Sequence, residues 1–426
     1  MDERLAGYAR LVPAGELVPS VGNLVRRLRA LADREPGLCR MRQIGTSRQG
    51  RALHVLSVGM GRRAALVVGG PHPNEPVGYA TVSFLANLVA ARPELRRDVA
   101  WHFLPCVDPD GAAMNSGWTS VPLDLHRQHR YFYRPALAEQ AEWTFPIPFG
   151  DGVHSFGLPE NAALAALVDE LEPIAAISLH NADFGAAFHI VSHEVPGLAA
   201  QLGAVAARHG LAGGAAPSDV AGWPVLGPGV YAMPPVDEVV IRDHEADAPA
   251  HGAHLVHYAS RYSTLTVLPE VPRWHTGAAF DDAPADALGA LADALGAEAT
   301  EIRQLMAEAG DLDDASGRAA ADTLAVADTV TRSWQHQAAA GGIVAGAELA
   351  EAHYTRVQLS LRSAGLALRA AADTSQADPG ARARLDRALS ERTRRAEREL
   401  RMMPVPLNRL VAVQACTALA ACALAR

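Results

Sequence analysis

VVGGPHPNEPVG, residues 67–78, predicts a buried strand, a rigid loop and the start of a helix. The apolar run ends at two glycines, and the three prolines that follow prevent a helix from running through the loop. Pro76 is suited to open the next helix, because a proline at the first helical position loses no hydrogen bond. The loop carries His72 and Glu75 at the carboxyl end of the strand, where open α/β sheets place their ligands. These two residues are the first candidates for a functional site.

Short β-branched runs alternate with helical stretches through residues 1–275. The runs are AALVVGG, VAWHFLPCV, IAAISLH and STLTVLP, at residues 64–70, 99–107, 174–180 and 263–269. Alternation of this kind is typical of a domain built around an α/β sheet. We therefore predict one sheet domain over residues 1–275.

Residues 276–426 differ in composition and predict a region made of helices alone. Prolines become rare there, and Ala, Leu, Glu and Arg recur at helical spacing. We expect about five helices, in a region that is also a candidate for pairing subunits. The apolar stretch at residues 410–425 has about 16 residues, whereas crossing a bilayer takes roughly 20. We therefore predict a packed terminal helix.

The overall composition is typical of a folded protein and gives no sign of a nucleic-acid partner. Hydrophobic residues make up 49% of the chain and charged residues 20%. The net charge is −9, and no basic stripe with interleaved aromatic residues occurs. The four cysteines form no CxxC pair, and the opening MDERLAGYAR lacks the pattern of a signal peptide. We expect a cytoplasmic protein with no membrane partner.

A third candidate ligand, His180, stands in AAISLHNADFG at the end of another predicted strand. Zinc accepts nitrogen and carboxylate ligands, and its catalytic sites use three protein groups and keep a position for water. Alone, a His-x-x-Glu pattern is more often a solvated pair in a loop. The rigid proline loop and the second strand-end histidine outweigh that interpretation. We predict one zinc ion held by His72, Glu75 and His180.

Glu270, in TLTVLPEVPRW, is the candidate general base. It follows an apolar run, so we expect its side chain at the same edge of the sheet as the metal ligands. A carboxylate can take a proton from water that zinc has acidified to near neutrality. An acid at a strand end is otherwise usually solvated, so the assignment depends on the predicted zinc site beside it.

Together these segments resemble the zinc metallocarboxypeptidase family, to which carboxypeptidase A belongs. The likeness begins with a helix and strand at residues 21–59, which include IGTSRQGRAL at residues 44–53. It continues through the His-x-x-Glu loop to LPCVDPDG, where Asp108 stands in place of the commoner asparagine. His180 and Glu270 then follow in the family's order, so that the resemblance covers about residues 5–275. It implies a mixed central sheet flanked by helices, with the helical region as a C-terminal appendage.

The resemblance also implies a mechanism and two roles for arginine. Glu270 would take a proton from the metal-bound water and deliver it to the leaving nitrogen, while one arginine stabilises the oxyanion. The family's separate Asn-Arg pair, which grips the substrate carboxylate, is missing here. In LDLHRQHRYFYRP, residues 123–135, we assign Arg134 to the oxyanion and Arg127 to the substrate carboxylate, with His126 in the asparagine's place. Asn181 is a further predicted substrate contact.

Two other histidine groups compete for a metal ion. The first is His251-x-x-His254-x-x-His257, whose spacing would align three imidazoles on one helical face, but we expect a surface stretch there. The second is the pair His126 and His129, which we expect to line the pocket rather than to bind a second ion.

Two alternative functions stay open. One is an N-acyl amino acid deacylase that resembles the aspartoacylase and succinylglutamate desuccinylase group, which uses the same three-ligand arrangement. The other is a non-catalytic zinc-bearing binding protein, against which the intact Glu270 argues. A serine hydrolase is not expected, because the chain has no Gly-x-Ser-x-Gly elbow. The expected substrate is a small peptide or an acyl amino acid.

Overall fold

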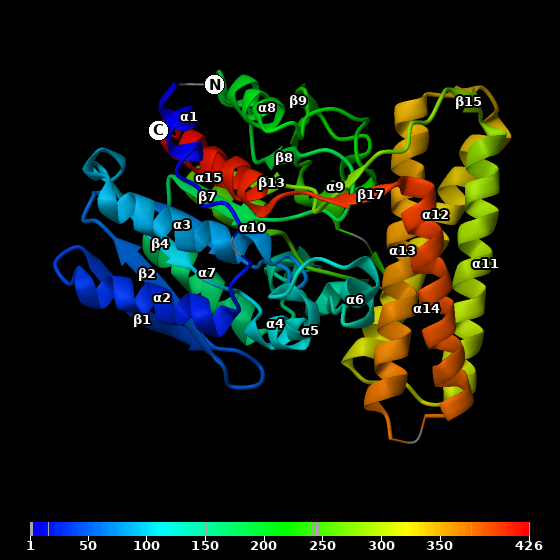
Figure 1. Ribbon diagram of the computed structural model, residues 1–426. Coiled ribbons are helices and arrows are strands. Elements are labelled where there is room, and N and C mark those ends of the chain that lie inside the picture. Colours follow the sequence, from blue (N-terminus) through cyan, green and yellow to red (C-terminus); the bar gives the residue numbers. More distant parts are fainter. Residues whose placement is uncertain are drawn as a thin grey trace.

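A mixed nine-stranded sheet with helices on both faces lies beside a bundle of four long helices (Figure 1). The computed structural model describes residues 3–15, 17–149, 151–240, 242–243, 248–375 and 377–425. In order across the sheet, the strands are β1 (Cys39–Thr46), β2 (Ala52–Val58), β4 (Val99–Leu104), β3 (Arg63–Gly69), β7 (Ala175–Leu179), β13 (Leu265–Glu270), β8 (Phe188–Val191), β10 (Val230–Ala232) and β9 (Val225–Gly227). This architecture confirms the predicted fold class.

The four strands expected from the sequence form the parallel centre of the sheet. β4, β3, β7 and β13 are neighbours and run in the same direction, whereas β1, β2 and β9 are joined by antiparallel pairing. Alternate residues of β3 face opposite sides, with Val67 in one apolar cluster and Leu66 in another. The strands are buried on both faces, which explains their continuous apolar runs.

Helices cover the two faces unequally. One face carries α2 (Val21–Arg34), α3 (Val77–Ala91), α8 (Leu198–Arg208) and α15 (Leu407–Leu424), and the other carries α7 (Pro159–Leu171) and α10 (Leu255–Ala259). α3 starts at Val77, with Pro76 as its N-cap rather than as its predicted first residue. The shorter elements are α1 (Glu3–Ala9), α4 (Pro109–Met114), α5 (Ser116–Thr119), α6 (Leu125–Arg130), α9 (Val236–Val239), β5 (Ile147–Phe149), β6 (Gly152–His154), β11 (Arg242–Asp243) and β12 (Ala248–Pro249).

The four helices of the bundle are inserted in the chain between two strands that pair with each other. The bundle consists of α11 (Asp286–Ala309), α12 (Ala315–Ala340), α13 (Gly346–Asp373) and α14 (Pro379–Leu400), with β15 (Ala283–Pro284) paired to β16 (Ile343–Val344). The chain leaves the sheet through β14 (Trp274–Thr276) and returns through β17 (Met402–Pro404), and these two strands pair antiparallel. With α15, the described residues after 276 contain five helices, as predicted. The division into two domains at residue 275 stays a prediction.

α15 packs on the central sheet instead of on the bundle. It is long and apolar enough to cross a membrane by length and composition, yet 72% of it is buried inside the protein. It contacts α3, α8 and β13. Its buried Gln414 accepts a hydrogen bond from Thr81 (2.6 Å) and donates one to the His180 carbonyl oxygen (2.6 Å). The packed terminal helix therefore supports the strand end that carries His180.

Asp108, the departure from the commoner asparagine, is a buried acid at the start of α4. Its Oδ1 accepts a hydrogen bond from the Gly111 N–H (2.8 Å) and caps the helix. Burial raises the pKa of Asp108 to about 6, although the Gly111 hydrogen bond and Arg48 oppose the shift. An asparagine could accept the same hydrogen bond without a buried charge.

We expect Asp108→Asn to stabilise the protein most at high pH. The folded-state pKa lies above the unfolded value, so the cost of ionising Asp108 builds up as pH rises from the unfolded value of 3.8 to about 6 and is fully present above that. The variant should gain about 3 kcal/mol at most at pH 8, and less as the pH is lowered to 5. Urea unfolding at both pH values measures this difference. An equal gain at both values would contradict a buried charge as the cause.

Candidate active site

Three adjacent parallel strands carry the four predicted metal-site residues to one edge of the sheet. His72 and Glu75 follow β3, His180 follows β7, and Glu270 ends β13. The loop after β3 begins with Gly70 at φ 52°, where a Cβ atom would lie 2.5 Å from the Tyr79 ring. All four side chains line one pocket of about 370 Å³. The structure therefore brings together the groups that the sequence predicted as a site.

Glu75 lies between the two histidines. Its Oε1 is 2.9 Å from His72 Nδ1, and its Oε2 is 2.9 Å from His180 Nδ1. Burial alone would raise the pKa of Glu75, but the two neighbouring imidazoles hold it well below its usual range. Burial lowers the pKa of His72 to about 4. Both imidazole Nδ1 atoms thus face one ionised carboxylate.

Glu270 stands on the other side of His180, with Oε1 3.6 Å from His180 Nδ1. Burial raises the pKa of Glu270 to about 8, where the charge of His180 opposes the shift and the charges of Glu75 and Asp219 add to it. A carboxylate with a pKa near neutrality can both accept and donate a proton. This geometry suits the predicted acid–base role.

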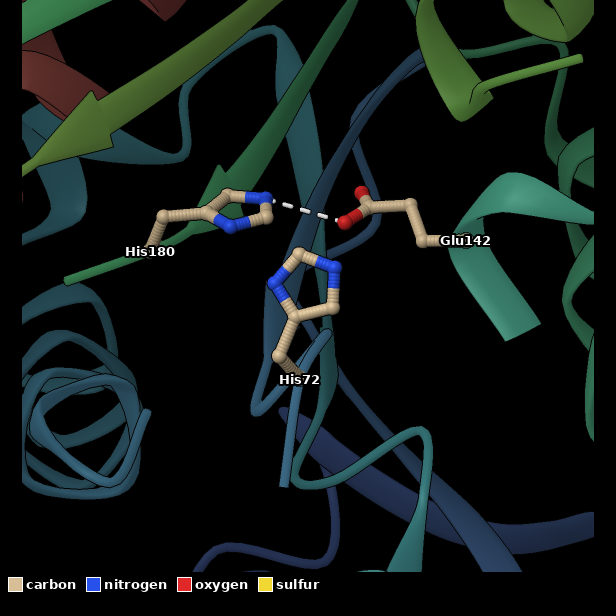
Figure 2. A group of neighbouring side chains, drawn as sticks. All are labelled: His72, Glu142 and His180. Atoms are coloured by element: carbon tan, nitrogen blue, oxygen red, sulfur yellow. Dashed lines mark ion pairs between the residues drawn. The ribbon is translucent and has the colours of Figure 1, made fainter. Parts of the chain in front are cut away.

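Glu142 is a site residue that the sequence analysis missed. It comes from the 3₁₀ turn η3 (Ala141–Trp143), and its side chain is fully buried. Its Oε2 lies 2.9 Å from His180 Nε2 and 3.5 Å from His254 Nε2. Figure 2 shows His72, His180 and Glu142 pointing toward one another. The only local signal was an acid beside apolar and aromatic residues in AEWTF, which is weak.

The histidine stretch expected at the surface is buried, so that expectation is wrong. His251 and His254 are almost completely inaccessible, and both line the pocket. His254 caps α10 and packs edge-on against Trp143, at 4.6 Å between ring centroids. The three residues do not share a helical face, because α10 starts only after His254.

The donor set fits a zinc ion. Among the described residues, two groups of three donor atoms lie within 4.8 Å of one another, namely His72 with Glu142 and His180, and Glu75 with His180 and Glu270. His180 belongs to both groups, whereas His72 and Glu75 fall into different groups, so the predicted set of three ligands is not itself one of the two. Neither ring nitrogen of His180 has a well-directed hydrogen bond, although a carboxylate oxygen lies 2.9 Å from each. Buried nitrogen and carboxylate donors of this kind are those that zinc prefers.

Arg134 and Asn181 also reach the pocket. Arg134 Nη1 donates to Glu75 Oε1 (2.9 Å), and its Nη2 lies 3.1 Å from His72 Nε2. Asn181 Oδ1 accepts from the Val77 N–H (3.2 Å), while its buried Nδ2 has no partner. Both side chains line the pocket, and the roles predicted for them stay predictions.

The structure places Arg127 and His126 outside this pocket, so it does not bring them together with the other predicted site residues, and their substrate contacts stay predictions. Arg127 donates to the Gly117 carbonyl oxygen (2.7 Å) beside a separate surface depression. His126 Nε2 lies 3.1 Å from Ser390 Oγ on α14. In helix α6, Arg127 is exposed, His126 faces α14 and His129 is buried, so that His129 does not line the pocket either.

Comparisons with known proteins find similarity to zinc carboxypeptidases. The family model described as zinc carboxypeptidase matches residues 24–183. Carboxypeptidase A from Helicoverpa armigera is 15% identical. The match covers 64% of this chain and 72% of the carboxypeptidase chain, with a TM-score of 0.41. Bovine thrombin-activatable fibrinolysis inhibitor is 14% identical. The match covers 62% of this chain and 87% of the inhibitor chain, with a TM-score of 0.38. No curated protein matches the chain.

The matched segment includes all three predicted metal ligands and Arg134. The expected resemblance is therefore confirmed. The zinc carboxypeptidase model matches residues 24–183 only, and this match supports a zinc metallopeptidase-like hydrolase.

Proposed function

We propose that this protein removes residues from the carboxyl ends of short peptides in the cytoplasm, with one zinc ion held by His72, Glu75 and His180. The observation that carries the proposal is the convergence of these ligands with Glu270 and Arg134 in one pocket, from separate strand ends and loops. The family match supports the same chemistry. The pocket of about 370 Å³ is of a size for a small substrate.

In the proposed mechanism, Glu270 takes a proton from the attacking water and returns it to the leaving nitrogen. A bound zinc ion supplies Lewis acidity and lowers the pKa of water. Arg134 turns guanidinium N–H groups toward the oxygen on which negative charge develops. The buried surroundings of Glu270 keep its pKa high enough for it to act in both directions.

A deacylase acting on N-acyl amino acids is the second candidate, because the same donors and base would serve it. We would incubate the purified protein with matched sets of short peptides and N-acyl amino acids, and measure metal content by mass spectrometry. Turnover of peptides only supports the peptidase, and turnover of acyl amino acids only supports the deacylase. Stoichiometric zinc with no turnover of either set would favour a binding protein. Subunit pairing through the helical region also stays a proposal.

We expect Glu270→Gln to keep zinc and lose turnover by at least about 100-fold, because the general base is removed while the ligands stay. His72→Ala or His180→Ala should lose both zinc and turnover. Metal content and peptide hydrolysis are measured on the same preparations. Normal turnover by Glu270→Gln would exclude this residue as the base.

We expect Glu142→Gln to weaken zinc binding by about 10- to 100-fold, since outer carboxylates orient ligating histidines and raise their basicity. Competition with a chromophoric chelator measures the affinity. Glu139→Gln is the matched control, because Glu139 pairs with Arg318 (2.8 Å) and does not line the pocket. Unchanged zinc affinity in Glu142→Gln would show that the contact with His180 does not support the metal.

A further inference from the structure

The helical bundle forms part of the pocket wall. α12 contributes Asp322, Thr323 and Val326, and α13 contributes Gln358, Leu359 and Arg362. The bundle's apolar core continues into the sheet domain through Phe132 and Trp274. Gly365 of α13 approaches so closely that a Cβ atom would lie 2.1 Å from the His129 carbonyl oxygen. This packing fixes α13 against the site.

Arg362 is tied to the loop that carries His180. Its Nη2 and Nε donate to Asp183 Oδ2, at 2.8 and 3.2 Å, and Asp183 follows His180 by three residues. The guanidinium lies over the Phe132 ring, 5.1 Å from its centroid. Its side chain is only 11% exposed, and it lines the pocket. Asp183 accepts from the Nε and Nη2 atoms of the guanidinium. The Nη1 atom makes no contact with Asp183, so it is the atom that we consider for a ligand.

Gln358, one turn earlier on α13, stands at that end. When its amide is oriented with the oxygen toward Arg362, the oxygen lies 2.8 Å from Nη1. Gln358 also lines the pocket. A neutral amide leaves the positive charge in place, so a substrate anion could replace or share this contact.

Two arginines act on the single carboxylate of Asp183. Asp183 is nearly inaccessible and acts on two guanidiniums, those of Arg362 and Arg273. Burial lowers the pKa of Arg273 to about 10, which still leaves it protonated at neutral pH, and its Nη1 has no hydrogen-bond partner. Burial lowers the pKa of the neighbouring His129 to about 4, so it is neutral. One carboxylate thus faces two cations, and of the two arginines Arg362 lines the pocket.

We propose that Arg362 binds the free carboxylate of the substrate, the role that the sequence had suggested for Arg127. The inference rests on the proposed function for its ligand class, because both a peptide end and an acyl amino acid carry such a group. A guanidinium is suited to this task, since its planar fork pairs with carboxylates. The bundle would then supply a specificity-determining residue rather than only a support.

Binding to the zinc-loaded Glu270→Gln protein tests this inference independently of turnover. The probes are N-acetyl-dialanine and its C-terminal amide, titrated calorimetrically. The acid should bind at least about 10-fold more tightly than the amide. Adding Arg362→Gln should weaken acid binding about 10- to 100-fold and change amide binding less than about 2-fold. Adding Arg362→Lys, which keeps the charge beside Asp183, should restore part of the difference.

Arg332→Gln is the matched control, because Arg332 is an exposed arginine of α12 outside the pocket. It should leave the binding of both probes unchanged. Equal binding of acid and amide, or an equal loss of both with Arg362→Gln, overturns the inference. If the unmodified protein cleaves peptides but the Glu270→Gln protein binds acid and amide equally, the inference about Arg362 is wrong and the proposed function is kept. If the acid binds in an Arg362-dependent way but the unmodified protein cleaves no peptide or acyl amino acid, the inference is kept and the proposed function is wrong.

Discussion

The parallel alignment of β3, β7 and β13 is the constraint on which the site depends. Ladder pairing between β3 and β7 sets Gly69 beside Leu179, so the loops that follow begin at the same level. An isolated bridge then sets His180 beside Glu270. Residues separated by some two hundred positions therefore meet because their strands end at one edge. A shift of one residue in either register would turn the following side chains to the opposite face.

A second constraint is the balance of buried charge around His180. Burial would lower the pKa of His180, but the carboxylates of Glu142 and Glu75 at its two ring nitrogens raise it well above the usual value. Without metal, a protonated imidazole between two acids limits the cost of burying them. A histidine that ligates a metal must lose that proton, and a divalent ion supplies the compensating charge instead. The same cluster is thus tolerable in both states, which allows it to stay buried.

Local signals in the sequence predicted the central strands and the residues at their ends. The proline loop holding His72 and Glu75 and the apolar runs before His180 and Glu270 each needed only a few neighbouring residues to be recognised. Glu142 was out of reach, because its contact with His180 depends on where a 3₁₀ turn packs. The position of Arg127 outside the pocket was out of reach for a related reason. The short helix α6 determines which of its side chains face the pocket, and motif order does not record that direction.

The path of the chain through the bundle explains why a simple division into a catalytic part and a terminal appendage misses the role of the last helix. β14 and β17 pair at the base of the bundle, so its entry and exit are held together like the ends of a long insertion. Beyond β17, α15 returns to the sheet, where Gln414 donates to the carbonyl oxygen of His180. Removing everything after residue 276 would therefore strip a buried helix from the core and a hydrogen bond from a candidate ligand. The bundle and α15 both contact the segment that follows β7, one through Arg362 and Asp183 and the other through Gln414. The geometry of His180 thus depends on chain segments on both sides of the bundle's base.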